Sequence, residues 1–455
     1  MSSENTREIV LDMLLVIERE EEYSHRLVGQ VLDKYGYLEA RQRAFIKRLF
    51  EGTLERRIEL DYRLNAISSV PTRKMKPLIR NLLRMSAYQL LYMDSVPDAA
   101  AVNEAVKLAG KRGFSKLKGF VNGILRNLSA NKTAAKLPSE RENPRQFLSV
   151  MYSVPEWIAE HFLESYSYEE TKSLLEGLLH IRPVMIRFVS GISTEEKENC
   201  IRAMEQAGVK ISGHAWVKDI RYLHDCENIA LLPGFAQGLF TVQDASSGLA
   251  VAAAGIKRGD RVLDICAAPG GKTLLAAEYA GPEGRVEARD ISPRRMERIE
   301  ENVSRMGLTN IDLKLWDATK RDEGAVESAD VVLADVPCSG LGVMGRKRDI
   351  KYRQTKEGLE PIVHLQREIL RQAAGYVKPG GTLLYSTCTI NPAENEQQVD
   401  WLCKEFGFVR ESIASFLPAD LPHADTAKEG FLQLLPHLHD TDGFFLARLK
   451  KQPLS

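Results

Sequence analysis

The chain has 455 residues, 44% of them hydrophobic and 27% charged, and a formal net charge of zero, which is ordinary for a globular protein of about three domains. No apolar run approaches the roughly 18 residues of a membrane span, and the polar start MSSENTREIV is unlike a signal peptide, so we expect a cytoplasmic protein with no membrane partner. Six cysteines without a C-x-x-C pair argue against a disulfide scaffold and against a zinc site, and we expect no metal.

Residues 1–130 are expected to form an all-α domain. Apolar residues recur at helical spacing in IVLDMLLVIERE (9–20) and RQRAFIKRLFEGTLERRIELDYRL (41–64). Pro77 is a favoured first residue for a further helix, and Asp98 is suited to cap the next one. Residues 131–144 lose all periodicity, so we interpret them as a linker.

Positive charge is concentrated at the start of the chain. Residues 1–136 hold 24 Lys and Arg against 16 Asp and Glu, a net charge of +8. Such an excess indicates an anionic partner, with nucleic acid as the first candidate. A solvated helical surface explains the charge count equally well.

The rest of the chain is expected to hold two further domains. Residues 145–235 combine helical patterns with the alternating strand VMIRFV (184–189), and Ser193 or Thr194 is suited to cap a helix, so we predict a small α+β domain. Over 236–455 strand, turn and helix alternate, which is typical of an α/β domain with a parallel sheet. The expected protein is therefore multidomain.

Polar residues stand at the ends of the predicted strands, where an open α/β sheet binds its ligands. They are Asp264, Asp290, Asp317, Asp335, Cys338 and Cys388. A carboxylate at the end of the second strand, such as Asp290, suits a ribose diol, and Asp317 could accept from an adenine amino group. Each aspartate alone could be a helix cap or a solvated strand end, but all four together favour a nucleoside ligand.

The segment DICAAPGGKT (264–273) ends as a phosphate loop does, in Gly-Lys-Thr. A phosphate loop also requires a glycine five residues before Gly271, and that position is Cys266. The indication of an NTPase is therefore weak. The alternative is a strand–loop–helix turn whose glycines allow close approach to a nucleoside.

Several segments resemble the RNA cytosine-C5 methyltransferases of the Nop/Sun group. They are DICAAPGGKT (264–273), ADVPCSG (334–340), YSTCTINPAENE (385–396), DGFFLARL (442–449) and FTVQDASSG (240–248). The resemblance covers about 236–450 and implies a Rossmann-like, seven-stranded domain that uses S-adenosylmethionine. In the first third, RQRAFIKRLFEGTLERRIELD and FVNGILRNL resemble the NusB helical bundle, which binds RNA.

This fusion implies methylation of cytosine 967 of 16S ribosomal RNA, free or in an early assembly intermediate. Residues 145–235 would then be a second RNA-binding domain, and we expect a monomer. The resemblance assigns the nucleophile to Cys388, product release to Cys338 and recognition of the cytosine edge to Asp335. The cofactor contacts it implies are Cys266, Ala267, Ala268, Pro269, Gly270, Gly271, Lys272, Asp290, Asp317 and Asp335.

The chemistry explains why such an enzyme needs thiols. Cytosine C5 is a poor nucleophile, and addition of a thiolate to C6 makes it a better one, so that covalent catalysis divides one hard step into two. Several alternatives remain open. They are another RNA cytosine-C5 methyltransferase, a DNA-type enzyme with Cys338 as nucleophile, an NTPase that binds ATP at 266–273, a non-catalytic NusB-like RNA-binding assembly factor, and cysteines that merely fill the core. The basic stretch GRKRDIKYRQTK (345–356) is interpreted as a phosphate-contacting loop.

Overall fold

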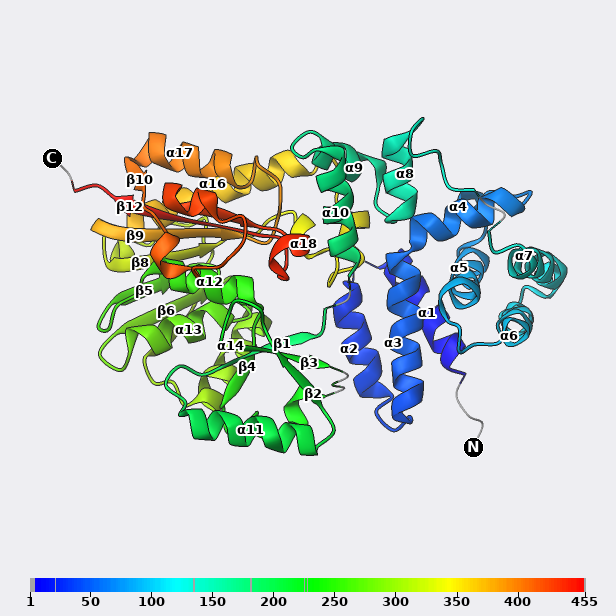
Figure 1. The fold of residues 1–455 in the computed structure, drawn as a ribbon, viewed down its shortest axis with the longest axis horizontal. Helices are drawn as coiled ribbons and strands as arrows, with labels where there is room; N and C mark the ends of the chain where they lie inside the picture. Colours follow the sequence, from blue (N-terminus) through cyan, green and yellow to red (C-terminus); the bar gives the residue numbers. More distant parts are fainter. Residues whose placement is uncertain are drawn as a thin grey trace. The chain divides into compact units, whose positions relative to one another are not determined.

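The computed structural model describes residues 5–20, 22–133, 136–180, 182–224, 226 and 228–453 (Figure 1). The chain separates into two compact units. We call the first the helical unit; it comprises Met1–Leu179 and Met344–Lys356. We call the second the sheet unit; it comprises His180–Val343 and Glu357–Ser455. The predicted segment 145–235 is thus divided between the two.

The helical unit confirms the all-α prediction for the first third of the chain. Asn5 caps the first helix by accepting from the backbone N–H groups of Arg7 and Glu8, and Pro77 begins a helix as predicted. Asp98 is not a cap; it is the first residue of its helix, and it accepts from Ser129 Oγ at 2.7 Å. The helices are α1 (Thr6–Arg19), α2 (Ser24–Lys34), α3 (Ala40–Glu55), α4 (Arg57–Ile67), α5 (Pro77–Tyr92), α6 (Asp98–Lys111), α7 (Lys118–Ala130), α8 (Pro144–Met151), α9 (Glu156–Leu163), α10 (Tyr168–Leu179) and α15 (Ile350–Arg353), with short 3-10 turns at Thr72–Lys74 and Ser115–Leu117.

Residues 344–356, the inserted segment, belong to the helical unit although they are far from it in sequence. Arg348, 8% exposed, donates to the Glu55 carboxylate at 2.6 Å, and Lys351, 2% exposed, donates to the Glu55 backbone carbonyl at 2.9 Å. Ser24 N–H donates to the Asp349 carboxylate at 3.3 Å. The interpretation of this stretch as a phosphate-contacting loop is therefore wrong for Arg348 and Lys351, because both are buried within the unit.

The sheet unit begins with a small antiparallel sheet. Its strands lie in the order β2-β3-β1-β4. Ser193, one of the two predicted N-caps, caps its helix and forms a full capping box with Glu196. The elements are β1 (Val184–Phe188), α11 (Thr194–Gln206), β2 (Lys210–Gly213), β3 (Ile220–His224) and β4 (Phe240–Val242), with a 3-10 turn at Ile229–Leu231.

The larger sheet has seven strands on one path, in the order β10-β12-β9-β8-β5-β6-β7, and β11 pairs with β12 as an eighth. Strands β5 to β9 are mutually parallel, whereas β12 is antiparallel to β9. Its strands are β5 (Arg261–Asp264), β6 (Arg285–Asp290), β7 (Ile311–Leu315), β8 (Ala329–Asp335), β9 (Val377–Thr387), β10 (Phe408–Arg410), β11 (Phe431–Leu434) and β12 (Phe444–Lys451). The helices that accompany it are α12 (Ala245–Ala254), α13 (Gly271–Ala280), α14 (Pro293–Met306), α16 (Leu359–Tyr376), α17 (Glu396–Phe406) and α18 (Pro436–His439), with 3-10 turns at Glu323–Ala325, Leu341–Val343, Ala414–Phe416 and Asp425–Glu429.

Helices cover both faces of the larger sheet. Val262 and Val331 pack in a hydrophobic cluster with residues of α12 and α13, whereas their neighbours Leu263 and Val332 pack in another with residues of α16 and α17. Because successive strand residues point to opposite faces, these clusters lie on opposite sides of the sheet. The carboxyl ends of β5, β6, β8 and β9 are thereby left at one edge, where the predicted site residues stand.

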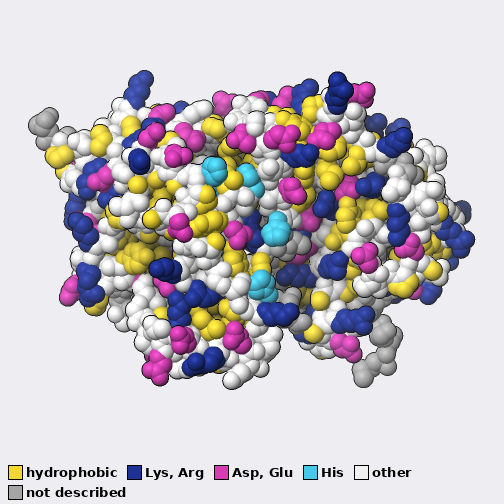
Figure 2. All heavy atoms as spheres, in the orientation of Figure 1, with side chains coloured by type: hydrophobic (Ala, Val, Ile, Leu, Met, Phe, Trp, Pro, Cys, Tyr) yellow, Lys and Arg dark blue, Asp and Glu magenta, His cyan; other side chains and the backbone are white. Residues whose placement is uncertain are grey.

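The surface carries charges of both signs. On the face shown in Figure 2, Lys and Arg side chains are interspersed with Asp and Glu side chains. Within the part of the chain that the structure describes, no helix has the length and apolar character needed to cross a membrane.

Candidate active site

The two predicted thiols lie side by side. Cys338 follows β8 and Cys388 follows β9, and these parallel neighbours pair Asp335 with Ser386. Both strands therefore deliver their next residues to the same edge, and the two Sγ atoms are 3.2 Å apart. That separation is far longer than the roughly 2.05 Å of a disulfide bond, and both cysteines are free and partly exposed. The pair is thus not a crosslink, and both thiols keep partial exposure although Cys388 also packs against a hydrophobic cluster.

Cys338 holds its proton firmly. Its hydrogen bond with Cys388, together with burial and the negative charges of Glu394 and Asp335, raises the pKa of the Cys338 thiol well above its usual value. A protonated Cys338 can donate to the sulfur of Cys388. The thiolate is the reactive form of a cysteine, so a donor at this sulfur lies where the reaction would need one.

Lys272 and Asp335 form an ion pair beside the thiols. Lys272 Nζ lies 2.8 Å from Asp335 Oδ2, and Ser386 Oγ donates to Asp335 Oδ1 at 2.9 Å. Burial opposes the charge of Lys272, but the charge and hydrogen bond of Asp335 outweigh it, so the pKa of Lys272 is raised, with Cys388 among the groups that contribute. The site therefore holds a protonated Lys272, paired with Asp335, near the sulfur of Cys388.

The loop 266–271 connects β5 to α13, as the sequence predicted. Gly270 has a φ of +103°, and a Cβ there would lie 3.2 Å from Ile299 side-chain atoms, so the turn requires glycine. The Ala267 N–H donates to the Arg289 carbonyl at 2.8 Å, which ties the loop to the end of β6. Burial, followed by nearby carboxylates, raises the pKa of Cys266 well above its usual value, so Cys266 stays a neutral thiol.

The end of this loop does not serve as a phosphate loop would. Lys272 is paired with Asp335, and Thr273 Oγ1 donates to Asp264 Oδ2 at 2.7 Å. Both groups would have to face phosphate and a cation in an NTPase. Asp264 is buried, which raises its pKa to about 6. The contacts thus weigh further against the NTPase alternative.

Two carboxylates at neighbouring strand ends fit a nucleoside ligand. Asp290, buried, accepts from the backbone N–H groups of Ala268 at 3.3 Å and Ser292 at 2.9 Å, and each of its oxygens keeps a lone pair for a ribose hydroxyl. Asp317 accepts from the Thr319 hydroxyl and N–H at 2.7 and 2.9 Å, and these bonds lower its pKa, so that it is an anionic acceptor. The donors and acceptors of this edge suit the ribose and base of such a ligand.

Glu394 is a site residue to which the sequence analysis assigned no role. Its buried carboxylate accepts from Ser339 N–H at 2.8 Å, Ser339 Oγ at 2.5 Å, Gln366 Nε2 at 3.0 Å and Asn391 Nδ2 at 2.9 Å. It thereby holds the loop that follows Cys338 against the loop that follows Cys388. The available signal was an acidic residue six positions beyond Cys388, within the motif NPAENE.

The contacts gather the predicted residues into two groups. Asp335, Lys272, Cys338 and Cys388 form one, through the ion pair, the Sγ–Sγ contact and the strand pairing. The loop 266–271 and Asp290 form the other group. Asp317 belongs to this second group because the backbone N–H of its neighbour Trp316 donates to the Asp290 carbonyl at 3.0 Å. Lys272, at the end of the loop, connects the two groups.

The chain is similar to known proteins over nearly its whole length. Residues 4–130 match the NusB family, and residues 252–450 match the family described as 16S rRNA methyltransferase RsmB/F. A Bacillus subtilis protein named probable ribosomal RNA small subunit methyltransferase B is 33% identical over 99% of this chain and 100% of its own. A Serratia proteamaculans protein named ribosomal RNA small subunit methyltransferase B is 31% identical over 93% of this chain and 96% of its own. The crystal structure of PH0851 is 26% identical, covers 99% of both chains and has a TM-score of 0.80.

Proposed function

Because the chain belongs to the ribosomal RNA small subunit methyltransferase B family, we propose that it methylates C5 of cytosine 967 in 16S ribosomal RNA through a covalent bond between Cys388 and C6 of the base. The family confirms the expected NusB-like helical region and Rossmann-like methyltransferase fold. Its members are ribosomal RNA methyltransferases of the cytosine-C5 type, and S-adenosylmethionine supplies the methyl group.

The contact between the two thiols carries this proposal. A single thiol is enough to attack C6, but the adduct must later be released. The 3.2 Å separation of Cys338 and Cys388 provides a second group at the sulfur that leaves. The pKa of Cys338 is raised, so its S–H is available as a donor there.

The chemical steps follow from the placement of these groups. The Cys388 thiolate, beside Lys272, adds to C6 and raises the electron density at C5, which would then take the methyl group of S-adenosylmethionine and release S-adenosylhomocysteine. Elimination next passes the C5 proton to a water molecule and expels Cys388 as a thiolate. Cys338 assists here because its S–H can donate to the departing sulfur. Asp335, held by Lys272 and Ser386, accepts from the cytosine amino group and so selects the base.

The remaining assignments are part of the same proposal. Asp290 binds the ribose of the cofactor, Asp317 its adenine, and Lys272 with the loop 266–271 its amino-acid end. Residues 1–130 and 145–235 bind RNA, 131–144 connect them, and 236–455 carry the chemistry. We expect the enzyme to act as a monomer in the cytoplasm on free RNA or an early assembly intermediate.

Single cysteine variants test the mechanism. Cys388→Ala should form no adduct and transfer no methyl group. Cys338→Ala should methylate once and remain attached, so that a protein–RNA species survives a denaturing gel, and the double variant should lose that species. Cys403→Ala, a partly exposed cysteine on α17, is the matched control and should behave as the wild type.

The result also distinguishes the alternatives. A trapped species in Cys388→Ala, and none in Cys338→Ala, would overturn the assignment in favour of the DNA-type mechanism. Normal turnover in both variants would exclude thiol catalysis. Bisulfite sequencing of 16S RNA from a deletion strain, with and without the gene restored, tests the position, and a modified cytosine elsewhere would refute cytosine 967 alone.

A further inference from the structure

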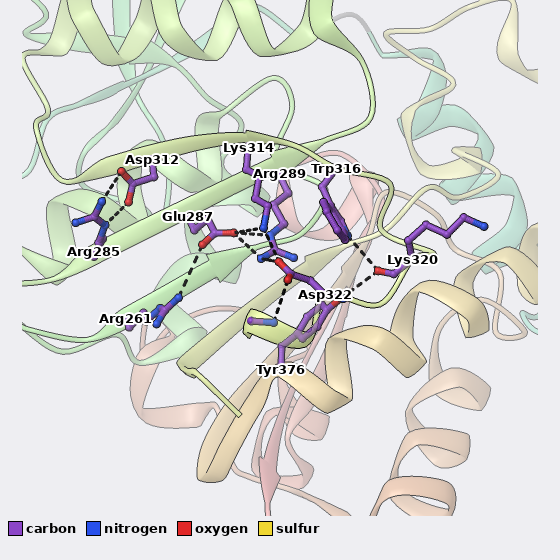
Figure 3. Close-up of polar contacts among 11 residues, drawn as sticks. Arg261, Arg285, Glu287, Arg289, Asp312, Lys314, Trp316, Lys320, Asp322 and Tyr376 are labelled. Carbon is purple, nitrogen blue, oxygen red and sulfur yellow. Dashed lines mark hydrogen bonds and ion pairs between the residues drawn. The ribbon is translucent and has the colours of Figure 1, made fainter. Parts of the chain in front are cut away.

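Arg289 is a nearly fully buried arginine, 1% exposed, directly before Asp290 on β6. Figure 3 shows its side chain among Glu287, Asp322 and Trp316. Arg289 Nε donates to Glu287 Oε1 at 2.7 Å, and its Nη2 donates to Asp322 Oδ2 at 2.7 Å. Its guanidinium also lies 5.6 Å from the ring centre of Trp316 and 5.3 Å from that of Tyr376. The arginine is thus enclosed by two carboxylates and two aromatic rings.

These groups hold both ends of one loop, residues 316–322. Trp316 begins the loop, and its indole N–H donates to the Lys320 carbonyl at 3.0 Å; Tyr376 OH donates to the same carbonyl at 3.1 Å. Asp322 ends the loop, and its N–H donates to Tyr376 OH at 2.9 Å while its carboxylate accepts from Arg289. The loop is therefore closed over the Arg289 side chain (Figure 3).

Burying the charged Arg289 side chain gives the fold little net stability. Arg289 Nη1 is buried and has no hydrogen-bond partner among the described residues, and a buried ion pair is often no more stabilising than apolar side chains of similar volume. Such a cluster instead holds its side chains in defined orientations, because charged and planar groups fix each other's geometry. What it orients here is the loop that contains Asp317.

We propose that Arg289 and Asp322 are positioning residues of the cofactor site, which hold the 316–322 loop so that Asp317 accepts from the amino group of the cofactor's adenine and distinguishes it from a 6-oxopurine. This inference rests on the proposed role of Asp317. It assigns specificity for the purine to residues that do not contact the cofactor. Backbone hydrogen bonds connect the cluster to Asp317 and to Asp290. The backbone N–H of Trp316 donates to the Asp290 carbonyl at 3.0 Å, and the backbone N–H of Lys320 donates to the Asp317 carbonyl at 2.9 Å.

Binding of two nucleosides tests the inference. Calorimetry of the full-length protein with S-adenosylhomocysteine and with S-inosylhomocysteine gives a ratio of dissociation constants. The inosyl compound has a carbonyl where the adenosyl compound has its amino group, so it cannot donate to the Asp317 carboxylate and places an oxygen against it. The wild type should therefore prefer the adenosyl compound roughly 10- to 100-fold. Asp317→Ala should reduce this ratio to near one.

Variants of the cluster should reproduce that loss of preference. Arg289→Met and Asp322→Asn should both bring the ratio close to that of Asp317→Ala, while S-adenosylhomocysteine still binds through the loop 266–271 and Asp290. Asp322→Asn keeps the shape of the side chain, so it remains informative if Arg289→Met folds poorly. Arg285→Met is the matched control, because the exposed Arg285 lies on the same strand and pairs with the partly exposed Asp312, away from the loop (Figure 3).

The outcomes distinguish the role of Asp317 from that of Arg289 and Asp322. Equal preference in the wild type and Asp317→Ala would refute the role of Asp317, and the present inference with it. A loss of preference in Asp317→Ala that neither Arg289→Met nor Asp322→Asn shares would overturn the positioning role alone. An equal loss of preference in Arg285→Met would also overturn the positioning role, because removal of any positive charge from β6 would then explain the result.

Discussion

Lys351 should make the stability of the helical unit depend on pH in a way that Lys351→Met removes. Its amine is buried within the inserted segment and donates to the Glu55 carbonyl at 2.9 Å. Burial lowers the pKa of Lys351 to about 7; Glu55 acts in the opposite direction, and Arg56, Arg348 and Arg57 add to the depression. Lys351 should therefore be half neutral near pH 7 in the folded protein.

The sign and size of this pH dependence follow from the difference between the pKa values of Lys351 in the folded and unfolded states. The pKa of Lys351 is about 7 in the folded protein, against the ordinary lysine value of 10.5, so between these values the unfolded chain binds more protons and stability rises with pH. At about 1.4 kcal/mol per unit, the depression of roughly 3.5 units corresponds to about 5 kcal/mol across the whole window. Between pH 7 and 9 the gain should be about 2 kcal/mol. Below pH 7 the amine is charged in both states, and the cost of burying the charge is present in full.

Urea unfolding at pH 7, 8 and 9, followed by circular dichroism, measures this dependence. The free energy of unfolding of the wild type minus that of Lys351→Met should rise with pH, since other titrating groups cancel in the difference. Lys347→Met, a more exposed lysine of the same segment, is the control for removal of a positive charge. A difference between wild type and Lys351→Met that stays constant from pH 7 to 9 would refute a neutral, buried Lys351.

Two further outcomes are expected. Glu394→Gln places an amide nitrogen against donors that now point to a carboxylate, so it should lower the free energy of unfolding by about 1–3 kcal/mol and slow methyl transfer more than it weakens S-adenosylhomocysteine binding; wild-type turnover, measured with tritiated cofactor, would contradict this. Lys47→Ala removes an exposed positive charge from α3 and should reduce the slope of log affinity for 16S RNA against log salt by about 0.7. Lys428→Ala, exposed in the sheet unit, should leave that slope unchanged, and a filter-binding titration that finds equal slopes for both variants would count against RNA binding by the helical unit.

Features determined by neighbouring residues could be predicted from the sequence. The strand ends at Asp264, Asp290 and Asp335 follow from short apolar runs that end in a polar residue. The capping box at Ser193 follows from the glutamate three residues later. The meeting of Cys338 with Cys388 required one further step, namely that parallel neighbours carry their carboxyl ends to the same edge.

Features that depend on residues far apart in the chain could not be predicted from the sequence. The burial of Arg348 depends on Glu55, which is 293 positions earlier in the chain, and six basic residues in a stretch of twelve otherwise indicate an exposed surface. The role of Glu394 depends on its contact with Ser339 across two loops. Arg289 resembled an ordinary strand residue, because the partner that fixes it, Asp322, lies beyond the next strand.

The inserted segment has a consequence for how the protein is made. Because synthesis proceeds from the N-terminus, helices α1 to α10 leave the ribosome well before Met344–Lys356. Until then the Glu55 carboxylate lacks Arg348, and Ser24 N–H lacks the Asp349 carboxylate. The helical unit can collapse early, but its last packing step waits until more than three quarters of the chain has been translated. Completion of the first unit thus reports that β8 and Cys338, which precede the segment, have already been synthesised.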